Sequence, residues 1–442
     1  MITAIPNHAF RNASIIETVI IPQRVSAIGA YAFCQCISLN EITIPATIKE
    51  ISDFTFYNCT SLSSVTIPNT VEKIGKEAFC LSGISSVTFS EGIQLAQIDD
   101  RAFHKCGNLS SVNIPSTVTR IGTSAFSHCT NLASVTLNEN NSIVTDENGN
   151  TSNFALIIGY YAFYNCPLIT DITFPSSVTA IGEEAFRDCI GLTNIIIPNT
   201  VETIYSKAFQ GCTNLNKVEF GDSVLNLGWK KVFVDCNKIR TVTITEGVKV
   251  IPSNAMTDAT TVLILKLPTT LTTIGDQAFL RCINIRSITI PYNVTKIGTE
   301  AFRDCTALGG AGEYEDGSTD YSEVIIFEEN ASNGSALSEI GVRAFYNCTG
   351  IETNINIPKS VTYIGTSCFS GCTNLPSVTL NSNTINNSYS GLTIGAWAFL
   401  NCSNLSKINF PSSVVYMASE AFKGCVSLKT VDVAYINSNA TI

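Results

Sequence analysis

The sequence is poor in charged residues, histidine and tryptophan. Of its 442 residues, 14% are charged, three are histidine and two are tryptophan. Charged residues make up about a quarter of an average globular protein, so we expect Ser, Thr and Asn to cover most of this surface. The 26 basic residues are outnumbered by 36 acidic ones, which gives a net charge of −10. A chain with this balance lacks the basic surface that binds nucleic acid or anionic lipid.

Long hydrophobic runs are also absent. The longest apolar run, FALIIGYYAFY at 154–164, is shorter than the about 20 residues that a membrane span needs. The first residues, MITAIPNHAF, show neither the basic nor the apolar region of a secretory signal. We therefore expect no membrane span. Three explanations for the missing signal stay open: export by another route, removal of the signal from this sequence, and a location inside the cell.

The sequence contains none of the common catalytic or nucleotide-binding motifs. GxxxxGK[ST], GxGxxG and HExxH do not occur, and no paired CxxC motif predicts a zinc site. His8, His104 and His128 lack a carboxylate or nucleophile at a distinctive spacing, which argues against a Ser/His/Asp or Cys/His site. We therefore predict that the protein is not an enzyme and holds no cofactor or metal ion.

What the sequence does contain is a repeat of about 23 residues along its whole length. Each repeat has one marker residue, in most cases the Phe of an Ala-Phe pair, at Phe10, Phe33, Phe56, Phe79, Phe103, Phe126, Phe163, Phe186, Phe209, Phe233, Met256, Phe279, Phe302, Phe345, Phe369, Phe399 and Phe422. Self-similarity at such a period predicts a solenoid in which each coil stacks on its neighbours. We predict a single solenoid of about 17 coils over residues 1–442, with no hinge.

The apolar pattern within one repeat predicts two short strands and a turn. Ile42 and Ile44 are two residues apart, as in a strand with one buried face, and Pro45 then ends that strand because it cannot donate a hydrogen bond. The following VxxIG segment predicts a second extended piece, and xxAFxxC predicts a helical turn. Pro6 and Pro252 occupy the same slot as the recurring Gly in two repeats, and proline cannot adopt a positive φ. We therefore expect that glycine is required in this slot because there is no room for a side chain, and not because the backbone needs a positive φ.

The pattern LxxIxIPxxVxxIGxxAFxxC resembles the leucine-rich repeat of BspA-like (Bacteroides surface protein A-like) proteins over residues 2–436. The resemblance implies a right-handed, curved leucine-rich-repeat solenoid of β-strands with short helical turns. Members of this class are mostly surface-exposed or secreted and are implicated in adhesion. The resemblance thus implies a cell-surface, adhesin-like scaffold for a host or matrix macromolecule, either protein or glycan. An alternative stays open, namely a structural or assembly scaffold in the cytoplasm or in a larger complex.

Most of the 17 cysteines occupy one slot of the repeat. Fourteen of them lie three residues after a marker, at Cys36, Cys59, Cys106, Cys129, Cys166, Cys189, Cys212, Cys236, Cys282, Cys305, Cys348, Cys372, Cys402 and Cys425. Because Ala13, Ser82 and Ala259 fill the same slot elsewhere, we expect these cysteines to be buried and reduced. Cys34 and Cys80 directly follow a marker and should face outward. Exposed thiols favour a reducing or anaerobic setting.

Three insertions break the period, at residues 138–157, 309–339 and 381–393. In repeat proteins, binding specificity resides on the strand face or in such loops. We expect the segments 328–339 and 381–393 to lie side by side, because they leave coils that are two apart, or about 10 Å. The predicted partner-binding residues are Glu313, Glu315, Asp316, Asp320, Glu328, Glu329, Asn381, Asn386 and Tyr389.

Two alternatives accompany this prediction. The acidic run from Glu313 to Glu329 could be a solvated loop, with binding left to the regular strand face. That face presents short polar side chains, at Thr43, Thr66, Asn113, Thr136, Thr173, Thr289, Asn356, Thr379 and Asn409. In the first insertion, Asp146 and Asn148 alternate as in a calcium loop, but Gly149 lies in the wrong register, so we do not expect calcium there.

Overall fold

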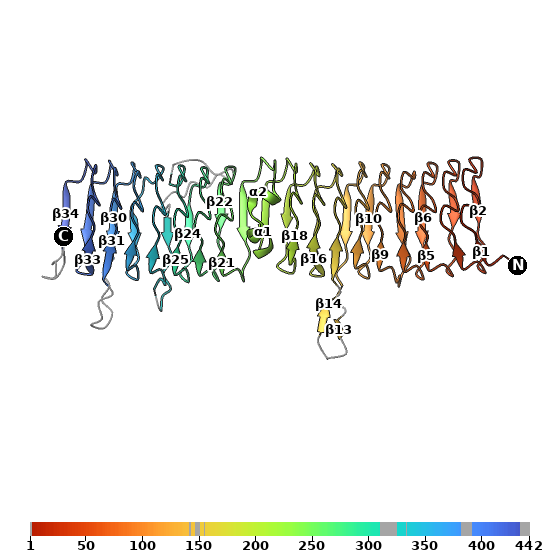
Figure 1. The fold of residues 1–442 in the computed structure, drawn as a ribbon, viewed down its shortest axis with the longest axis horizontal. Coiled ribbons are helices and arrows are strands. Elements are labelled where there is room, and N and C mark those ends of the chain that lie inside the picture. Colours follow the sequence, from red (N-terminus) through yellow and green to blue (C-terminus); the bar gives the residue numbers. More distant parts are fainter. Residues whose placement is uncertain are drawn as a thin grey trace. The chain divides into compact units, whose positions relative to one another are not determined.

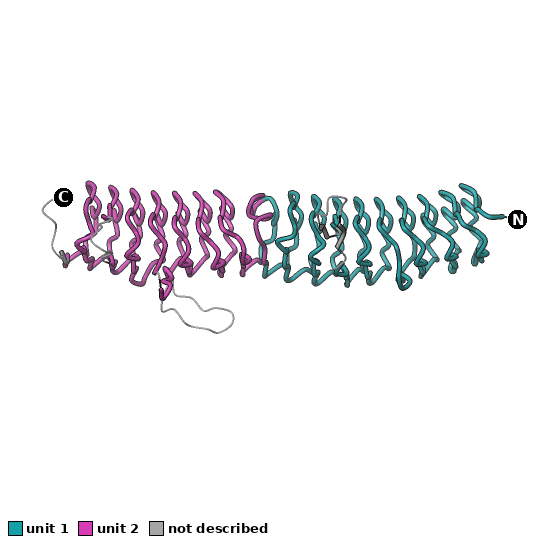
Figure 2. Tube along the Cα trace, turned by 90° about the horizontal axis from the view of Figure 1, so that it is seen from below, with its two compact units in different colours: residues 1–218, 231–238 teal, residues 219–230, 239–442 magenta. Residues whose placement is uncertain are grey.

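The structure, a computed structural model, describes residues 2–140, 143–145, 151–153, 155–309, 325–332, 334–381 and 391–433. It divides into two compact units (Figure 2). Unit 1 comprises residues 1–218 and 231–238, and unit 2 comprises residues 219–230 and 239–442. Within each unit, consecutive coils stack in parallel (Figure 1). This confirms the repeat solenoid, whereas one continuous body over 1–442, its handedness and its curvature stay predictions.

Each regular coil contains two short strands, one before the proline and one before the glycine of the repeat. In unit 1 the first set is β2 (Thr18–Ile20), β4 (Glu41–Thr43), β6 (Ser64–Ile67), β8 (Ser86–Phe89), β10 (Ser111–Ile114), β12 (Ser134–Leu137) and β17 (Asn194–Ile196). The second set is β1 (Ala4–Ile5), β3 (Ala27–Ile28), β5 (Glu50–Ile51), β7 (Lys73–Ile74), β9 (Gln97–Ile98), β11 (Arg120–Ile121), β15 (Leu156–Ile158), β16 (Val178–Ile181) and β18 (Thr203–Ile204).

Unit 2 repeats the same arrangement. Its first set is β20 (Thr241–Ile244), β22 (Ile264–Lys266), β24 (Ile288–Ile290), β26 (Ile325–Phe327), β28 (Ile355–Ile357), β30 (Ser377–Leu380), β32 (Lys407–Phe410) and β34 (Thr430–Val433). Its second set is β21 (Val250–Ile251), β23 (Thr273–Ile274), β25 (Lys296–Ile297), β27 (Glu339–Ile340), β29 (Tyr363–Ile364), β31 (Leu392–Ile394) and β33 (Val414–Met417). Strand β19 (Lys217–Phe220) also belongs to the first set.

The burial pattern of the strands follows from the alternation of apolar and polar residues in the sequence. In β6, Val65 and Ile67 are buried while Ser64 and Thr66 are exposed. Pro68 comes next, and its carbonyl accepts a hydrogen bond from the Val71 N–H at 3.1 Å. The proline therefore ends the strand and closes a turn, as predicted.

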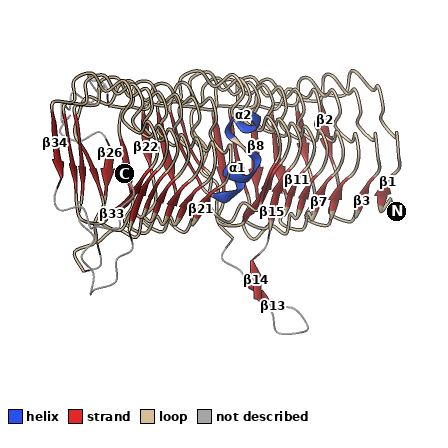
Figure 3. Cartoon of the chain, turned by 60° about the vertical axis from the view of Figure 1, so that its left-hand side comes forward, coloured by secondary structure: helices blue, strands red, loops and turns tan. Residues whose placement is uncertain are grey.

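Two departures from the regular coil were not predicted from the sequence. The first insertion contains an antiparallel hairpin of β13 (Ile143–Thr145) and β14 (Thr151–Asn153), which projects from the coils of unit 1 (Figures 1 and 3). Two short helices, α1 (Asp222–Leu227) and α2 (Trp229–Val232), take the place of a strand and its turn (Figure 3). The sequence lacks the proline of the repeat there.

The segments around the markers are runs of tight turns rather than the helical turns that we expected. In each coil, the residues two before and two after the marker tend to have positive φ, as do Tyr31 (59°) and Gln35 (61°) on either side of Phe33. Backbone N–H groups alternate in direction: that of Cys34 donates within the coil to Tyr31, and that of Phe33 donates to Thr55 of the next coil. The turns thus form a third ladder between coils.

Stacked phenylalanine side chains form the centre of the core in each unit. Neighbouring markers in unit 1, from Phe10 to Phe233, have ring centroids 5.1–5.7 Å apart and rings within 21° of parallel. In unit 2, the rings from Phe279 to Phe422 lie 5.0–5.4 Å apart. Each ring therefore packs on the coils before and after it, and the burial of a coil depends on its neighbours.

The slot three residues after the marker holds buried, free thiols. Thirteen of the fourteen cysteines in this slot are buried, and Cys425 is half-buried. Each donates its S–H to the backbone carbonyl of the marker in the preceding coil, as Cys59 Sγ does to the Phe33 carbonyl at 3.1 Å. The expected position of Cys34 and Cys80 was wrong. Both are buried, with 3% of their surface exposed, because they are covered by neighbouring coils; Tyr57, in the same slot of the coil between them, lies near both thiols.

The recurring glycine is required for space. A Cβ atom on Gly122 would lie 2.5 Å from the carbonyl carbon of Asp99 and 2.6 Å from the nitrogen of Asp100, in the adjacent coil. Gly122 is not among the glycines with positive φ. Close approach of neighbouring coils is therefore the reason for this glycine, as the prolines in the same slot indicated.

We predict that replacing one ring of the phenylalanine stack destabilises the protein strongly. Phe163 is fully buried between Phe126 and Phe186, at centroid distances of 5.4 and 5.3 Å. Phe163→Ala should lower the free energy of unfolding by about 3–5 kcal/mol, because it leaves a cavity between coils. Urea unfolding monitored by circular dichroism measures this. Leu168→Ala is the matched control, since Leu168 is 49% exposed and should change stability by about 0.5 kcal/mol or less.

We also predict that stability falls steeply above pH 9. Burial raises the pKa of Cys106, Cys282 and Cys372 from 9.0 to about 12. The unfolded chain then loses protons that the folded chain keeps, so the free energy of unfolding decreases as pH rises from about 9 towards about 12, by roughly 1 kcal/mol per pH unit for each thiol. Urea unfolding across this range should show a shallower decline for the Cys282→Ala, Cys372→Ala double variant. An unchanged slope would contradict the thiol origin.

Candidate binding groove

The sheet of first strands in unit 2 is interrupted between β26 and β28. Strand β26 pairs with β24 in parallel, with Ile325 opposite Ile288. Strand β28 belongs to a separate sheet, whose order is β28-β30-β32-β34. The two strands come from consecutive coils, which in a regular stretch such as β6 and β8 pair along their length.

One additional residue in the sequence accompanies this interruption, whereas the breaks between β4 and β6 and between β22 and β24 occur at the regular spacing. In regular coils the first buried residue of the strand lies three positions after the preceding buried residue, as Ile42 does after Leu39. In the coil of β28 this spacing is four, from Ile351 to Ile355. The additional residue lies in the exposed or half-buried segment 352–354. Because strand pairing depends on register, we infer that the odd residue at this point shifts β28 out of register with β26.

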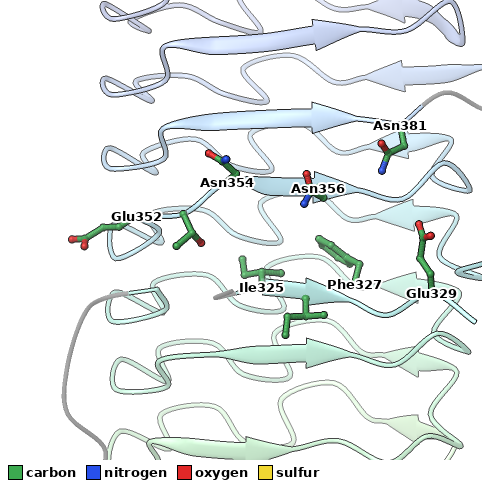
Figure 4. A pocket seen from close by; sticks show the side chains of 9 residues that line it. Ile325, Phe327, Glu329, Glu352, Asn354, Asn356 and Asn381 are labelled. Atoms are coloured by element: carbon green, nitrogen blue, oxygen red, sulfur yellow. The ribbon is translucent and has the colours of Figure 1, made fainter. Parts of the chain in front are cut away.

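A groove with a volume of about 790 Å³ opens at this interruption (Figure 4). Its lining residues come from β26, from the segment before β28, from β28 itself and from the positions that follow β26 and β30: Ile325, Ile326, Phe327, Glu329, Glu352, Thr353, Asn354, Asn356 and Asn381. The volume is within the range of small-molecule and cofactor sites. Most of the lining side chains are polar, and none is basic.

The side chains of the groove are spread over three neighbouring coils, those of β26, β28 and β30 (Figure 4). Glu352 lies at one end, Glu329 and Asn381 lie at the other, and Phe327, Asn354 and Asn356 lie between them (Figure 4). Phe327 is half-buried, unlike its fully buried counterpart Ile67 in β6. Part of the aromatic ring is therefore accessible in the groove, as part of Phe89 is at the same position of β8.

Hydrogen bonds fix two of the three asparagines. Ser377 Oγ donates to Asn354 Oδ1 at 2.5 Å, so Asn354 presents its NH2 group as a donor. The backbone N–H of Asn381 donates to the carbonyl of Ile357 at 3.2 Å, which holds Asn381 beside the end of β28. Asn356 is an exposed side chain within β28. The three amides thus offer both donors and acceptors along one groove.

The structure brings together two of the residues that we predicted as partner contacts. Glu329 and Asn381 line the same groove, although 52 positions separate them. Glu328 is half-buried beside them, and its backbone N–H donates to Ile290 at 3.0 Å. Glu313, Glu315, Asp316, Asp320, Asn386 and Tyr389 lie outside the described residues, and their role stays a prediction. Asp146 and Asn148, which we weighed for calcium, also lie outside them.

The sequence analysis missed the aromatic and amide side chains between these two ends. Phe327, Glu352 and Asn354 were not among the predicted residues, and Asn356 was considered only as one of the polar strand residues. The signal that could have found them is the spacing of four between Ile351 and Ile355, since one extra residue marks a bulge.

The histidines offer no catalytic arrangement. His104 and His128 lie in adjacent coils with ring centroids 5.5 Å apart. Burial, together with the charges of His128 and Lys105, lowers the pKa of His104 to about 4. Within the described ranges, no group of three or more His, Cys, Asp or Glu side chains is arranged to hold a metal ion. In the same ranges, no helix has the length and apolar character of a membrane span.

We predict that deleting Thr353 closes the groove. The deletion restores the spacing of three between the positions of Ile351 and Ile355, so β28 should pair with β26 and cover Phe327. Hydrogen exchange of the β26 and β28 amides should slow, with unchanged or higher resistance to urea. Deletion of Ser63 is the matched control, because it shortens a regular coil and should destabilise the protein. Faster exchange in the Thr353 deletion would contradict our explanation of the interruption.

The comparisons with known proteins agree with this architecture. The model of the BspA type leucine rich repeat region matches residues 3–133, 96–149, 156–262, 190–309 and 384–441. Among solved structures, a leucine-rich repeat protein from Bacteroides ovatus is 27% identical with a TM-score of 0.51, over 86% of this chain and 82% of that one. A search of curated proteins finds no match.

Two other solved structures are similar over different lengths. A leucine rich cell surface protein from Faecalibacterium prausnitzii is 21% identical with a TM-score of 0.31, over 99% of this chain and 84% of that one. The leucine rich repeat protein of T. pallidum is 24% identical with a TM-score of 0.30, over 50% and 77%. The family model matches more than half of the sequence, and the chain therefore belongs to the BspA-type leucine-rich repeat family.

Proposed function

We propose that this protein is an adhesin-like protein of the cell surface that binds a host or matrix macromolecule through the groove of unit 2. Leucine-rich repeat solenoids are typically non-enzymatic scaffolds that bind proteins or other macromolecules. The observation that supports a site here is the interruption between β26 and β28, where polar side chains and part of Phe327 become accessible. In the regular strand β6, the counterpart of Phe327 is the fully buried Ile67.

The charge of the groove limits its partners. No Lys or Arg is among the nine lining residues, and Glu329 and Glu352 lie at its ends. A polyanion would be repelled by these carboxylates, and it would find no cation there to pair with. The groove therefore suits a neutral or cationic partner and not nucleic acid.

The position of the cysteines removes an objection to a surface location. We had expected Cys34 and Cys80 to be exposed, which would favour a reducing setting. Both are buried, and burial raises the pKa of Cys80 to about 12. A buried, protonated thiol is a poor nucleophile, so these residues are compatible with an oxidising environment.

The test replaces the irregular segments by the residues of a regular coil. Residues 328–339 and 381–393 would each become Pro-Ala-Thr-Ile-Lys-Glu, which are residues 45–50 of this sequence. We expect the purified full chain to bind saturably to extracellular matrix laid down by epithelial cells, and the double replacement to weaken that binding by roughly 10-fold or more. Biolayer interferometry measures both.

The matched control is the same replacement of residues 138–157 in unit 1, which should leave binding unchanged. Undiminished binding after the double replacement would assign binding to the regular strand face instead. A membrane-impermeant label on intact cells tests the location. Failure to label the protein would favour the alternative of a scaffold inside the cell.

A further inference from the structure

We propose that the groove between β26 and β28 binds a neutral oligosaccharide. This inference rests on the proposed function, because it assigns a chemical class to the partner of the same site. It depends on three features of the groove, namely its amides, the half-buried ring of Phe327 and its terminal carboxylates.

The three amides match the hydroxyl groups of a sugar. Each sugar hydroxyl both donates and accepts a hydrogen bond, and an asparagine side chain offers an NH2 donor beside a carbonyl acceptor. Asn356 and Asn381 present such side chains at exposed positions, and Asn354 is oriented by the bond from Ser377. All three line one groove, so consecutive hydroxyls of one chain could bind to them.

Phe327 supplies the apolar contact that a sugar ring needs. A pyranose ring has a face of C–H groups, which packs against the flat face of an aromatic side chain. Phe327 is half-buried and lies between Asn356 and the carboxylate of Glu329 in the groove (Figure 4). An aromatic ring with polar groups around it suits a ligand that has one apolar face and a polar rim.

The composition of the lining disfavours a peptide and a sulfated glycan. The centres of protein–protein interfaces are apolar and enriched in aromatic residues, Met and Arg, and Phe327 is the single residue of these types among the nine that line this groove. Sulfate groups would meet Glu329 and Glu352 without a cation to pair with. The neutral hydroxyls of an unsulfated oligosaccharide meet neither obstacle.

The first experiment measures the binding of the full chain to an array of neutral and sulfated oligosaccharides, followed by titration calorimetry with the neutral ones that bind. We expect binding to neutral oligosaccharides only. Asn356→Ala and Phe327→Leu should each weaken it by roughly 3- to 10-fold. The matched control is Asn113→Ala, at the equivalent exposed position of β10 in unit 1, which should leave affinity unchanged. Binding to sulfated oligosaccharides alone, or to none, would overturn the inference.

Two further measurements separate this inference from the proposed function. Mild periodate oxidation of the matrix cleaves the vicinal diols of sugars and should abolish binding, whereas heparinase should not. If periodate has no effect while Asn356→Ala still weakens binding, the partner is a protein, so the adhesin function stands and the glycan assignment fails. If the chain binds no matrix, the adhesin function fails, and the array alone decides the glycan assignment. Circular dichroism verifies the fold of each variant.

Discussion

The stacking of one coil on the next is the constraint on which the rest of the structure depends. The rings of consecutive phenylalanines lie about 5 Å apart in each unit, and the backbone ladders of the strands and turns have to share that spacing. A coil whose two strands and turns all form hydrogen bonds with the adjacent coils buries its apolar side chains against both neighbours. This explains why small residues recur where coils approach most closely, as at Gly122. It also explains why the chain has many residues with positive φ, because the hydrogen bonds between the turns of adjacent coils compensate for the local strain.

The same constraint gives the cysteine slot its chemistry. The carbonyl of each marker accepts the backbone N–H of the cysteine slot in its own coil, as Phe33 does from Cys36 at 3.2 Å, and its second lone pair is free to accept from the next coil. A thiol is small enough for that space and donates a hydrogen bond to the carbonyl, as Cys59 and Cys305 do at 3.1 and 3.2 Å. The abundance of cysteine is thus a matter of packing and of an additional hydrogen bond in the core, as the recurrence of one slot predicted.

The groove occurs where the sequence departs from the regular repeat length. One extra residue precedes β28 and an insertion precedes β26, yet the phenylalanine stack is undisturbed, since Phe302, Phe345 and Phe369 keep centroid distances of 5.2 and 5.3 Å. The core therefore remains regular while the surface above it opens. Such a division lets a repeat protein acquire a site without loss of the stacking that stabilises it.

The sequence by itself determined the fold class, the number of coils, the strands before Pro68 and its equivalents, and the burial of the cysteine slot, because each follows from a local period of apolar residues. The insertions also pointed to Glu329 and Asn381. Only the tertiary structure decided the rest. The segments around the markers were expected to be short helical turns and are runs of tight turns, in which Asn, Asp and Gly are frequent at the second positive-φ position, as at Asn58 and Asp304. Hydrogen bonds to the next coil stabilise that conformation. The groove was hidden for the same reason: whether Phe327 and Asn356 are accessible depends on the pairing of two strands from different coils, and pairing is a property of the stacked structure rather than of either strand.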